Sequence, residues 1–220
     1  MNSSIKYFFP LILLLASTDS SCQTVSEIFL NSNWQFRKAG DTAWLPATVP
    51  GTIHTDLFAN KKIPDPFWGN NEKDLQWIED ADWEYQTFFS VDEKVFNQPQ
   101  IELEFEGLDT YAKIFLNDSL ILSSDNMFRW WNVDVKSQIK SGLKKKNNHL
   151  LIHFESAVRK GKEIAKLLPY ILPGDKKVFT RKAQYQYGWD WGPRFVTCGI
   201  WRPVKIISWN EIKLIDVYAE

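Results

Sequence analysis

The segment with the most distinctive chemistry spans residues 183–194, which read Ala-Gln-Tyr-Gln-Tyr-Gly-Trp-Asp-Trp-Gly-Pro-Arg. Glycines bracket Trp189, Asp190 and Trp191, and glycine at both ends permits a tight or unusual backbone path. Indole faces can pack on the C–H surface of a pyranose ring, while a carboxylate accepts charge-assisted hydrogen bonds from neighbouring hydroxyls. These residue types fit a sugar clamp. They fit equally well two core tryptophans beside an aspartate that caps a turn.

A second candidate segment, from Trp68 to Trp83, crowds five acidic residues between three tryptophans: Glu72, Asp74, Glu79, Asp80 and Asp82. Two carboxyl groups about 5 to 9.5 Å apart can hydrolyse a glycoside, one as acid and the other as nucleophile or base. Sequence spacing within a loop does not define such a distance. Because acidic side chains are mostly exposed in folded proteins, the segment favours a solvated acidic loop.

Metal and thiol chemistry are not predicted. The three histidines are His54, His149 and His153, and none forms a helical ligand pair or joins a carboxylate-rich calcium loop. Cys198 lies between Thr197 and Gly199, which is typical of a small buried residue and not of a nucleophile. The sequence therefore predicts no metal site, no disulfide framework and no cofactor.

Composition excludes several classes of function. The chain has 220 residues, enough for one domain with a hydrophobic core but too few for a large enzyme barrel. It has 44% hydrophobic and 24% charged residues with a formal net charge of -1, so we expect no nucleic-acid partner and no acidic membrane partner. The unusual feature is its 11 tryptophans, which suit either sugar stacking or a β-sandwich core.

The N-terminus is typical of a signal peptide. Lys6 precedes an uncharged apolar run from Tyr7 to Ala16, and small residues follow. The run is shorter than the roughly 20 residues that span a bilayer. We therefore predict a signal peptide over residues 1–22 and export of the chain. Acylation of Cys22 is the less favoured alternative, because Asp19 stands where a lipoprotein signal normally has an aliphatic residue.

The body of the chain has the period-two pattern of antiparallel strands. Apolar and polar residues alternate over 101–106 and 150–154, further strands are expected over 83–89, 114–122 and 201–209, and a new alternating strand is expected to begin over 212–220. Asn117-Asp118 marks a tight hairpin within residues 114–122. Helices are expected only over 52–60, with Thr52 as N-cap, and over 159–168. At least six strands and few helices predict an all-β sandwich.

Several longer motifs resemble one known family. They are Val49-Pro-Gly-Thr-Ile-His-Thr-Asp-Leu57, Ile63-Pro-Asp-Pro-Phe-Trp-Gly-Asn-Asn-Glu72, Phe105-Glu-Gly-Leu-Asp-Thr110, Asp125-Asn-Met-Phe128 and Arg181 through Pro203. Together, in this order, they resemble the N-terminal sugar-binding domain of the β-mannosidases of glycoside hydrolase family 2. The resemblance runs from Trp34 to Trp209. It implies a jelly-roll β-sandwich of the galactose-binding-domain type over 23–209, with short helices in loops, and a truncated immunoglobulin-like domain over 210–220.

The resemblance also implies a function. Such enzymes are exo-acting, retaining glycosidases that remove terminal non-reducing β-D-mannose from oligosaccharides and glycoproteins, with both catalytic glutamates on a (β/α)8 barrel that follows. It implies no catalytic residue in this chain, which contributes a substrate-binding loop, Trp189-Asp190-Trp191, to the mannose pocket. Trp201 and Arg181 are further candidates for that pocket. The expected partners are a mannose-terminated oligosaccharide and the barrel of the same full-length chain.

Three alternatives remain open at this point. The domain could be a stand-alone carbohydrate-binding module, a structural cap on a barrel, or part of a related β-galactosidase or β-glucuronidase. The expected location is periplasmic or extracellular, or lysosomal in a eukaryote, where Asn117-Asp118-Ser119 would be a glycosylation sequon.

Overall fold

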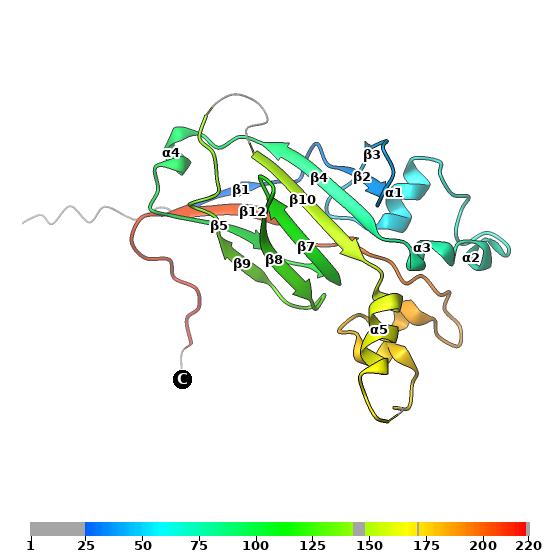
Figure 1. The fold of residues 1–220 in the computed structure, drawn as a ribbon. Coiled ribbons are helices and arrows are strands. Elements are labelled where there is room, and N and C mark those ends of the chain that lie inside the picture. The colour runs from blue at the N-terminus through cyan, green and yellow to red at the C-terminus, as the bar shows by residue number, and fades with distance from the viewer. Residues whose placement is uncertain (1–24, 143–147, 171, 219–220) are drawn as a thin grey trace, which may run out of the picture.

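A computed structural model describes residues 25–142, 148–170 and 172–218. Within them two antiparallel sheets face each other, and the helices lie at the ends of the sandwich (Figure 1). The predicted all-β sandwich with short helices in loops is confirmed. The predicted signal peptide lies outside the described residues. No helix among those residues is both long and apolar enough to cross a bilayer.

The larger sheet has six strands in the order β3-β2-β4-β10-β7-β8. The bounds are β2 Gln35–Lys38, β3 Leu45–Pro46, β4 Trp83–Phe89, β7 Tyr111–Leu116, β8 Ser119–Asp125 and β10 Asn148–Glu155. Central strand β10 pairs with both β4 and β7, and its side chains alternate strictly between buried and half-buried. The period-two pattern thus places one face of this sheet in the core, as the sequence predicts.

The second sheet has four strands in the order β1-β12-β5-β9. The bounds are β1 Ser26–Phe29, β5 Gln100–Phe105, β9 Trp131–Asp134 and β12 Val204–Trp209, and a separate two-stranded ribbon joins β6 Leu108–Asp109 to β11 Gly199–Ile200. The outer face of β5 is less solvated than its alternation predicts. Glu104 is buried there, with Lys205 Nζ 3.6 Å from its carboxylate.

The core lies between the two sheets. Its fully buried side chains come from strands of both, with large members Phe36, Tyr85, Phe105, Phe154, Ile101 and Ile206. Burying such side chains stabilises the fold by about 1.5 to 3 kcal/mol each. The predicted hairpin is confirmed, because Asn117 and Asp118 both have positive φ (50° and 70°) in the two-residue turn between β7 and β8.

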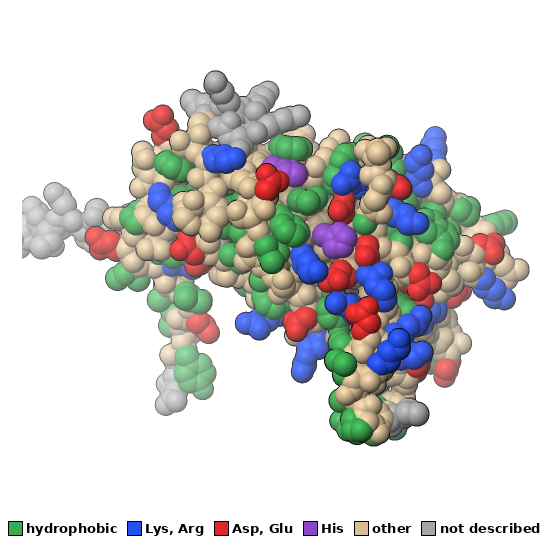
Figure 2. Space-filling model, in the orientation of Figure 1, with side chains coloured by type: hydrophobic (Ala, Val, Ile, Leu, Met, Phe, Trp, Pro, Cys, Tyr) green, Lys and Arg blue, Asp and Glu red, His purple; other side chains and the backbone are tan. Residues whose placement is uncertain are grey.

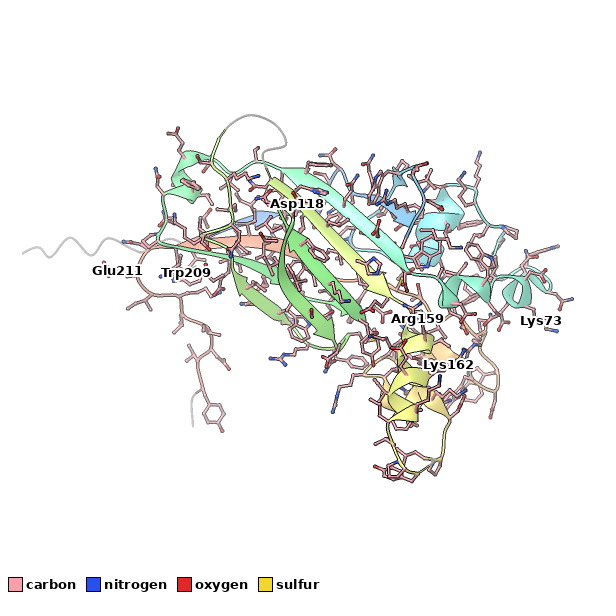
Figure 3. All side chains as sticks on the ribbon, viewed as in Figure 1. Lys73, Asp118, Arg159, Lys162, Trp209 and Glu211 are labelled. Carbon is pink, nitrogen blue, oxygen red and sulfur yellow. The ribbon has the colours of Figure 1, made fainter. Side chains whose placement is uncertain are left out.

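Most helices gather at one end of the sandwich (Figure 1). They are α1 Ile53–Ala59, α2 Asn71–Asp74, α3 Trp77–Asp80 and α5 Ala157–Lys166, with short 3-10 helices at Lys176–Phe179 and Gln184–Tyr187, whereas α4 Glu93–Phe96 lies at the other end. Lys73 on α2 and the residues Trp209 and Glu211 mark these opposite ends (Figure 3). Hydrogen bonds join several of the segments that resemble the glycosidase family, since Gly51 N donates to Ile200 O and Met127 N donates to Arg181 O.

Both helices expected from the sequence are found as α1 and α5, whereas the short helices α2, α3 and α4 were not predicted. Thr52 is the N-cap of α1, where its backbone N–H donates to Thr55 Oγ1 at 3.2 Å. Helix α5 begins at Ala157, two residues before the expected start, because Ser156 Oγ accepts a hydrogen bond from Arg159 N at 3.1 Å and caps it.

The expected final strand is not formed. Residues 210–218 have no regular secondary structure, and their apolar side chains are exposed. An extended segment becomes a strand only where a neighbouring strand accepts its backbone hydrogen bonds, and no such neighbour lies among the described residues. The immunoglobulin-like domain stays a prediction.

Candidate functional site

The predicted clamp is an exposed loop tip. Trp189 is 56% exposed and Trp191 is 83% exposed, and Asp190 between them is also exposed. The two indoles contact each other edge to face with centroids 5.9 Å apart. The interpretation that both tryptophans belong to the sandwich core is therefore wrong. We refer to Trp189, Asp190 and Trp191 as the tip.

The tip is closed by backbone hydrogen bonds. Trp189 N donates to Gly192 O and Gly192 N donates to Trp189 O, both at 3.3 Å. Gly188 precedes this turn with a φ of 93°, a left-handed conformation that a residue with a Cβ adopts only with strain. The glycines thus do what the sequence predicts, which is to turn the backbone sharply so that three side chains project from one loop.

Arg194, directly after the tip, is held by a dense set of polar contacts. Its guanidinium donates to Glu79 Oε1 (2.7 Å), Gln76 Oε1 (3.1 Å) and the carbonyl of Tyr187 (3.0 Å). Its backbone N–H donates to Glu72 Oε1 (2.6 Å), and its carbonyl accepts from Gln76 Nε2 (3.0 Å). These bonds join the loop on both sides of the tip to helices α2 and α3. We refer to Arg194 with Glu72, Gln76 and Glu79 as the clamp base.

The acidic segment therefore has a different role from both interpretations made from sequence. Glu72 and Glu79 are only partly exposed and bind Arg194, so they are not a free pair of carboxylates for glycoside hydrolysis. The solvated loop predicted there is found only at Asp74 and Asp80, which are exposed. Asp82 is also paired, since its carboxylate accepts from Arg159 Nη2 at 2.6 and 2.8 Å.

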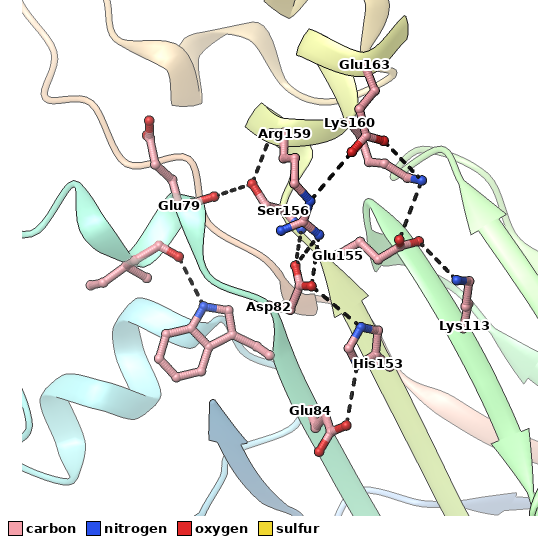
Figure 4. A network of polar contacts seen from close by, with 12 residues as sticks. Glu79, Asp82, Glu84, Lys113, His153, Glu155, Ser156, Arg159, Lys160 and Glu163 are labelled. Atoms are coloured by element: carbon pink, nitrogen blue, oxygen red, sulfur yellow. Dashed lines mark hydrogen bonds and ion pairs between the residues drawn. The ribbon is translucent and has the colours of Figure 1, made fainter. Parts of the chain in front are cut away.

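A polar network links the clamp base to α5 (Figure 4). Ser156 donates its hydroxyl to the carbonyl of Glu79 and its backbone N–H to Asp82. His153, on β10, lies 3.4 Å from Glu84 and 3.8 Å from Asp82, which places it in this network. Acidic and basic side chains alternate over this face of the molecule, so it carries no field of a single sign (Figure 2).

A buried ion pair holds the start of the loop. Lys182 Nζ is 2.5 Å from Asp109 Oδ1 and donates to the carbonyl of Thr197 at 2.6 Å, with both charged side chains fully buried. Gln186 Nε2 lies 3.4 Å from the other oxygen of Asp109. The loop is thus tied to β6 at its start and to α2 and α3 after its tip. Sequence reasoning missed Lys182, because lysine is almost always exposed.

Arg181 and Trp201 lie together but apart from the tip. The carbonyl of Arg181 accepts from Met127 N at 3.0 Å, and Trp201 Nε1 donates to Met127 O at 3.1 Å. Trp201 is partly buried, with the Arg202 guanidinium 4.4 Å above its ring. Within the described ranges, no hydrogen bond, ion pair or ring contact joins either residue to the tip. The backbone of Met127 thus binds both residues, Arg181 through its carbonyl and Trp201 through its indole N–H.

Two hollows adjoin the tip. One of about 480 Å³ is polar, and Asp190, Lys177, Glu72 and Arg194 line it. The other, of about 650 Å³, is mainly aromatic and is lined by Phe67, Tyr185, Trp189, Trp191 and Phe195 among others. Asp190 therefore offers a carboxylate beside one hollow, while the two indoles offer apolar surface to the other.

Titratable groups elsewhere fit structural roles. Burial raises the pKa of the Cys198 thiol far above its ordinary value, with Asp109 adding to the effect, so this cysteine stays protonated and poorly nucleophilic. Burial, followed by the nearby Lys182 charge, lowers the pKa of His54 to about 4. Among the described residues, no group of three or more potential metal ligands gathers in space.

Comparison with known proteins identifies the class. The family model described as "Glycosyl hydrolase 2 galactose-binding domain-like" matches residues 34–202, and the chain belongs to this family. Over 199 residues the chain is 41% identical to the protein named Beta-mannosidase B of Thermothelomyces thermophilus, covering 87% of this chain and 23% of that protein. The Neosartorya fischeri protein of the same name is 38% identical over 207 residues, again with 87% and 23% covered.

Solved structures agree with this assignment. The crystal structure of the β-D-mannosidase from Dictyoglomus thermophilum superposes with a TM-score of 0.84 at 42% identity, over 88% of this chain and 24% of that one. The β-D-glucuronidase of the same organism has a TM-score of 0.55 at 15% identity, which shows a shared fold alone. The chain spans about a quarter of the length of the mannosidases that it matches.

Proposed function

We propose that this chain is the N-terminal domain of an exo-acting β-mannosidase that releases terminal β-D-mannose from oligosaccharides and glycoproteins. The observation that carries the proposal is the exposed tip on a fixed base: two indoles and a carboxylate project from a loop that Arg194 and Lys182 hold on either side. Mannosidases at about 40% identity are the relatives that support this specificity over a β-galactosidase or β-glucuronidase.

Asp190 would act by positioning the sugar. Its carboxylate accepts no hydrogen bond and pairs with no cation within the described residues, so all its acceptor sites are available to substrate hydroxyls. By binding sugar hydroxyls remote from the reacting carbon, Asp190 would hold the ring while it distorts toward the oxocarbenium-like state. Closure of the pocket at this end would give the exo specificity. Proton donation and nucleophilic attack belong to the two glutamates that the resemblance assigns to the barrel.

The test compares Asp190→Ala and Asp190→Asn in the full-length enzyme. Both variants should lower kcat/KM for a β-mannoside by 100-fold or more, because an interaction of the transition state is removed. The covalent intermediate should still form with an activated fluorosugar, measured by intact mass. Full rescue of Asp190→Ala by an aryl mannoside with a good leaving group would instead assign Asp190 as the proton donor.

Two measurements separate the other candidates. A stand-alone binding module should bind mannobiose well as an isolated chain, whereas a domain that only completes a pocket should bind it very weakly in isothermal titration. A structural cap should show a lower melting temperature and unchanged kcat/KM when Trp189 or Asp190 is replaced.

Two further assignments stay predictions. Arg181 and Trp201 were expected to line the same pocket, and their place beside Met127 gives that expectation no support from contacts with the tip. Export with removal of residues 1–22 rests on the N-terminal sequence pattern alone. The N-terminal residue of the mature protein, read by mass spectrometry, tests it.

A further inference from the structure

An exposed aromatic surface larger than the tip lies beside it. Phe67 is 78% exposed in the loop before α2, Phe58 is exposed on α1, and Tyr185 is exposed just before the tip. Two hollows run between these rings, and both are lined by Phe67 and Phe195. We refer to the surface formed by the following rings as the aromatic face: Phe58, Phe67, Tyr185, Trp189, Trp191 and Phe195.

Ring contacts link the aromatic face around Phe195. Phe67 and Phe195 contact each other edge to face at 5.5 Å, and His54 lies 5.3 Å from Phe195. The smaller hollow, of about 270 Å³, is lined by His54, Phe58 and Phe67 together with Asp65 at its margin. Since burial lowers the pKa of His54 to about 4, its imidazole is neutral in this hollow above pH 5.

A sugar is too small and too polar to cover this surface. An aromatic side chain has about 150 to 250 Å² to bury, so several rings that are half exposed or more offer several hundred Å² of apolar area. Apolar patches of that size on soluble proteins mark interaction sites, and a stable protein interface covers about 800 Å² on each partner. A mannose ring at the tip would leave Phe58 in water, because Phe58 lines the smaller hollow and not the one beside the two indoles.

The chemistry of the surface and the length of the relatives point to one occupant. Relatives that match 87% of this chain are about four times longer than the segment they share with it. The proposed function also requires the catalytic part to border the tip. Trp189 and Trp191 line the same hollow as Phe67, so a body that borders the tip on that side also reaches the aromatic face.

We propose that the aromatic face is the docking surface for the catalytic part of the same enzyme, with Phe67 and Phe58 buried against it. This inference rests on the proposed function for the identity of the partner. Docking there would hold the tip at a fixed distance from the catalytic glutamates, so that the Asp190 carboxylate and the reacting carbon keep one geometry.

Hydroxyl-radical footprinting of the full-length protein without sugar tests the proposal. Oxidation of Phe67 and Phe58, read by mass spectrometry, should be at least fivefold slower than their exposure in this domain predicts. Leu120, which is 56% exposed beside the β7–β8 turn, serves as the calibrating control and should be oxidised as its exposure predicts. Phe67→Ser should raise the oxidation of Phe58 severalfold and lower kcat/KM, and the matched Leu120→Ser should change neither.

Each result decides the question. Full oxidation of Phe67 and Phe58 overturns the proposal, even in an enzyme that cleaves mannosides. Protection that disappears on dilution assigns the face to a second copy, and protection that appears only with added mannose assigns it to the sugar; both overturn it. Protection without β-mannosidase activity leaves the docking surface standing and rejects the proposed function.

Discussion

The loop of residues 180–197 contains two regions with opposite physical character. At the tip, Trp189, Asp190 and Trp191 are exposed, and their side chains contact little beyond each other. On either side of it, Lys182 is fully buried in an ion pair and Arg194 donates to three different acceptors. The difference indicates how such a loop can be both accessible and rigid. Ordering the tip costs conformational entropy, and the contacts of Lys182 and Arg194 outside the tip offset that loss.

The comparison also separates two kinds of carboxylate. Glu72, Glu79 and Asp109 each bind a cation or a backbone N–H and hold the loop in place. Asp190 has no such partner among the described residues. A carboxylate that already holds the loop in place has fewer acceptor sites for a substrate, so the exposed and unpaired Asp190 is the better candidate for recognition.

The largest effect is expected for Lys182→Met. It leaves Asp109 charged, buried and without its cation, which should lower the free energy of unfolding by about 3 to 5 kcal/mol. Denaturant unfolding of this chain measures it. The double variant Lys182→Met with Asp109→Asn should recover part of the loss, because no buried charge is then left unpaired. A loss below 1 kcal/mol for the single variant would show that the pair does not hold the loop.

Arg194→Ala should have a smaller effect on stability and a large one on activity. Its side-chain bonds to Gln76, Glu79 and the Tyr187 carbonyl are only partly shielded from water, so we expect a loss of about 2 kcal/mol. The tip would lose its fixed position, and kcat/KM of the full-length enzyme should fall at least tenfold.

Arg159→Ala is the matched control for that variant. Arg159 is similarly exposed and also binds a carboxylate, Asp82, but it lies on α5, and within the described ranges no hydrogen bond or ion pair joins its side chain to the loop. Its replacement should cost similar stability while kcat/KM stays within twofold. If both variants reduced kcat/KM equally, the effect of Arg194 would be one of general stability.

The strands were largely predictable from the sequence, because apolar and polar residues alternate along each of them. Asn148–Glu155 and Gln100–Phe105 show the period of two that a half-buried sheet imposes, and both form the strands expected. The segment 210–218 has a comparable pattern and forms no strand, since a strand also depends on a partner that alternation does not supply. Local pattern predicts the elements, and pairing decides which of them form.

The contacts of the site were not predictable in the same way. Arg194 and Glu79 are 115 positions apart, and Lys182 and Asp109 are 73 apart, so no window of sequence contains both members of either pair. The acidic segment and the tip were each identifiable by composition, but only folding brings them together. The types of residue at the tip fitted a sugar clamp and two core tryptophans equally well, whereas the exposure of the tip and the contacts that hold it depended on the fold.

Trp191→Ala should have the smallest effect on stability. Its indole is 83% exposed and its one recorded ring contact is with Trp189, so the free energy of unfolding should change by less than about 0.5 kcal/mol. In the full-length enzyme kcat/KM for a β-mannoside should fall roughly tenfold, because aromatic stacking on the sugar is lost. Trp191→Phe keeps a ring and should retain most of the activity. If Trp191→Ala lowered the free energy of unfolding by 2 kcal/mol or more and left kcat/KM unchanged, Trp191 would instead have a structural role like that of the clamp base.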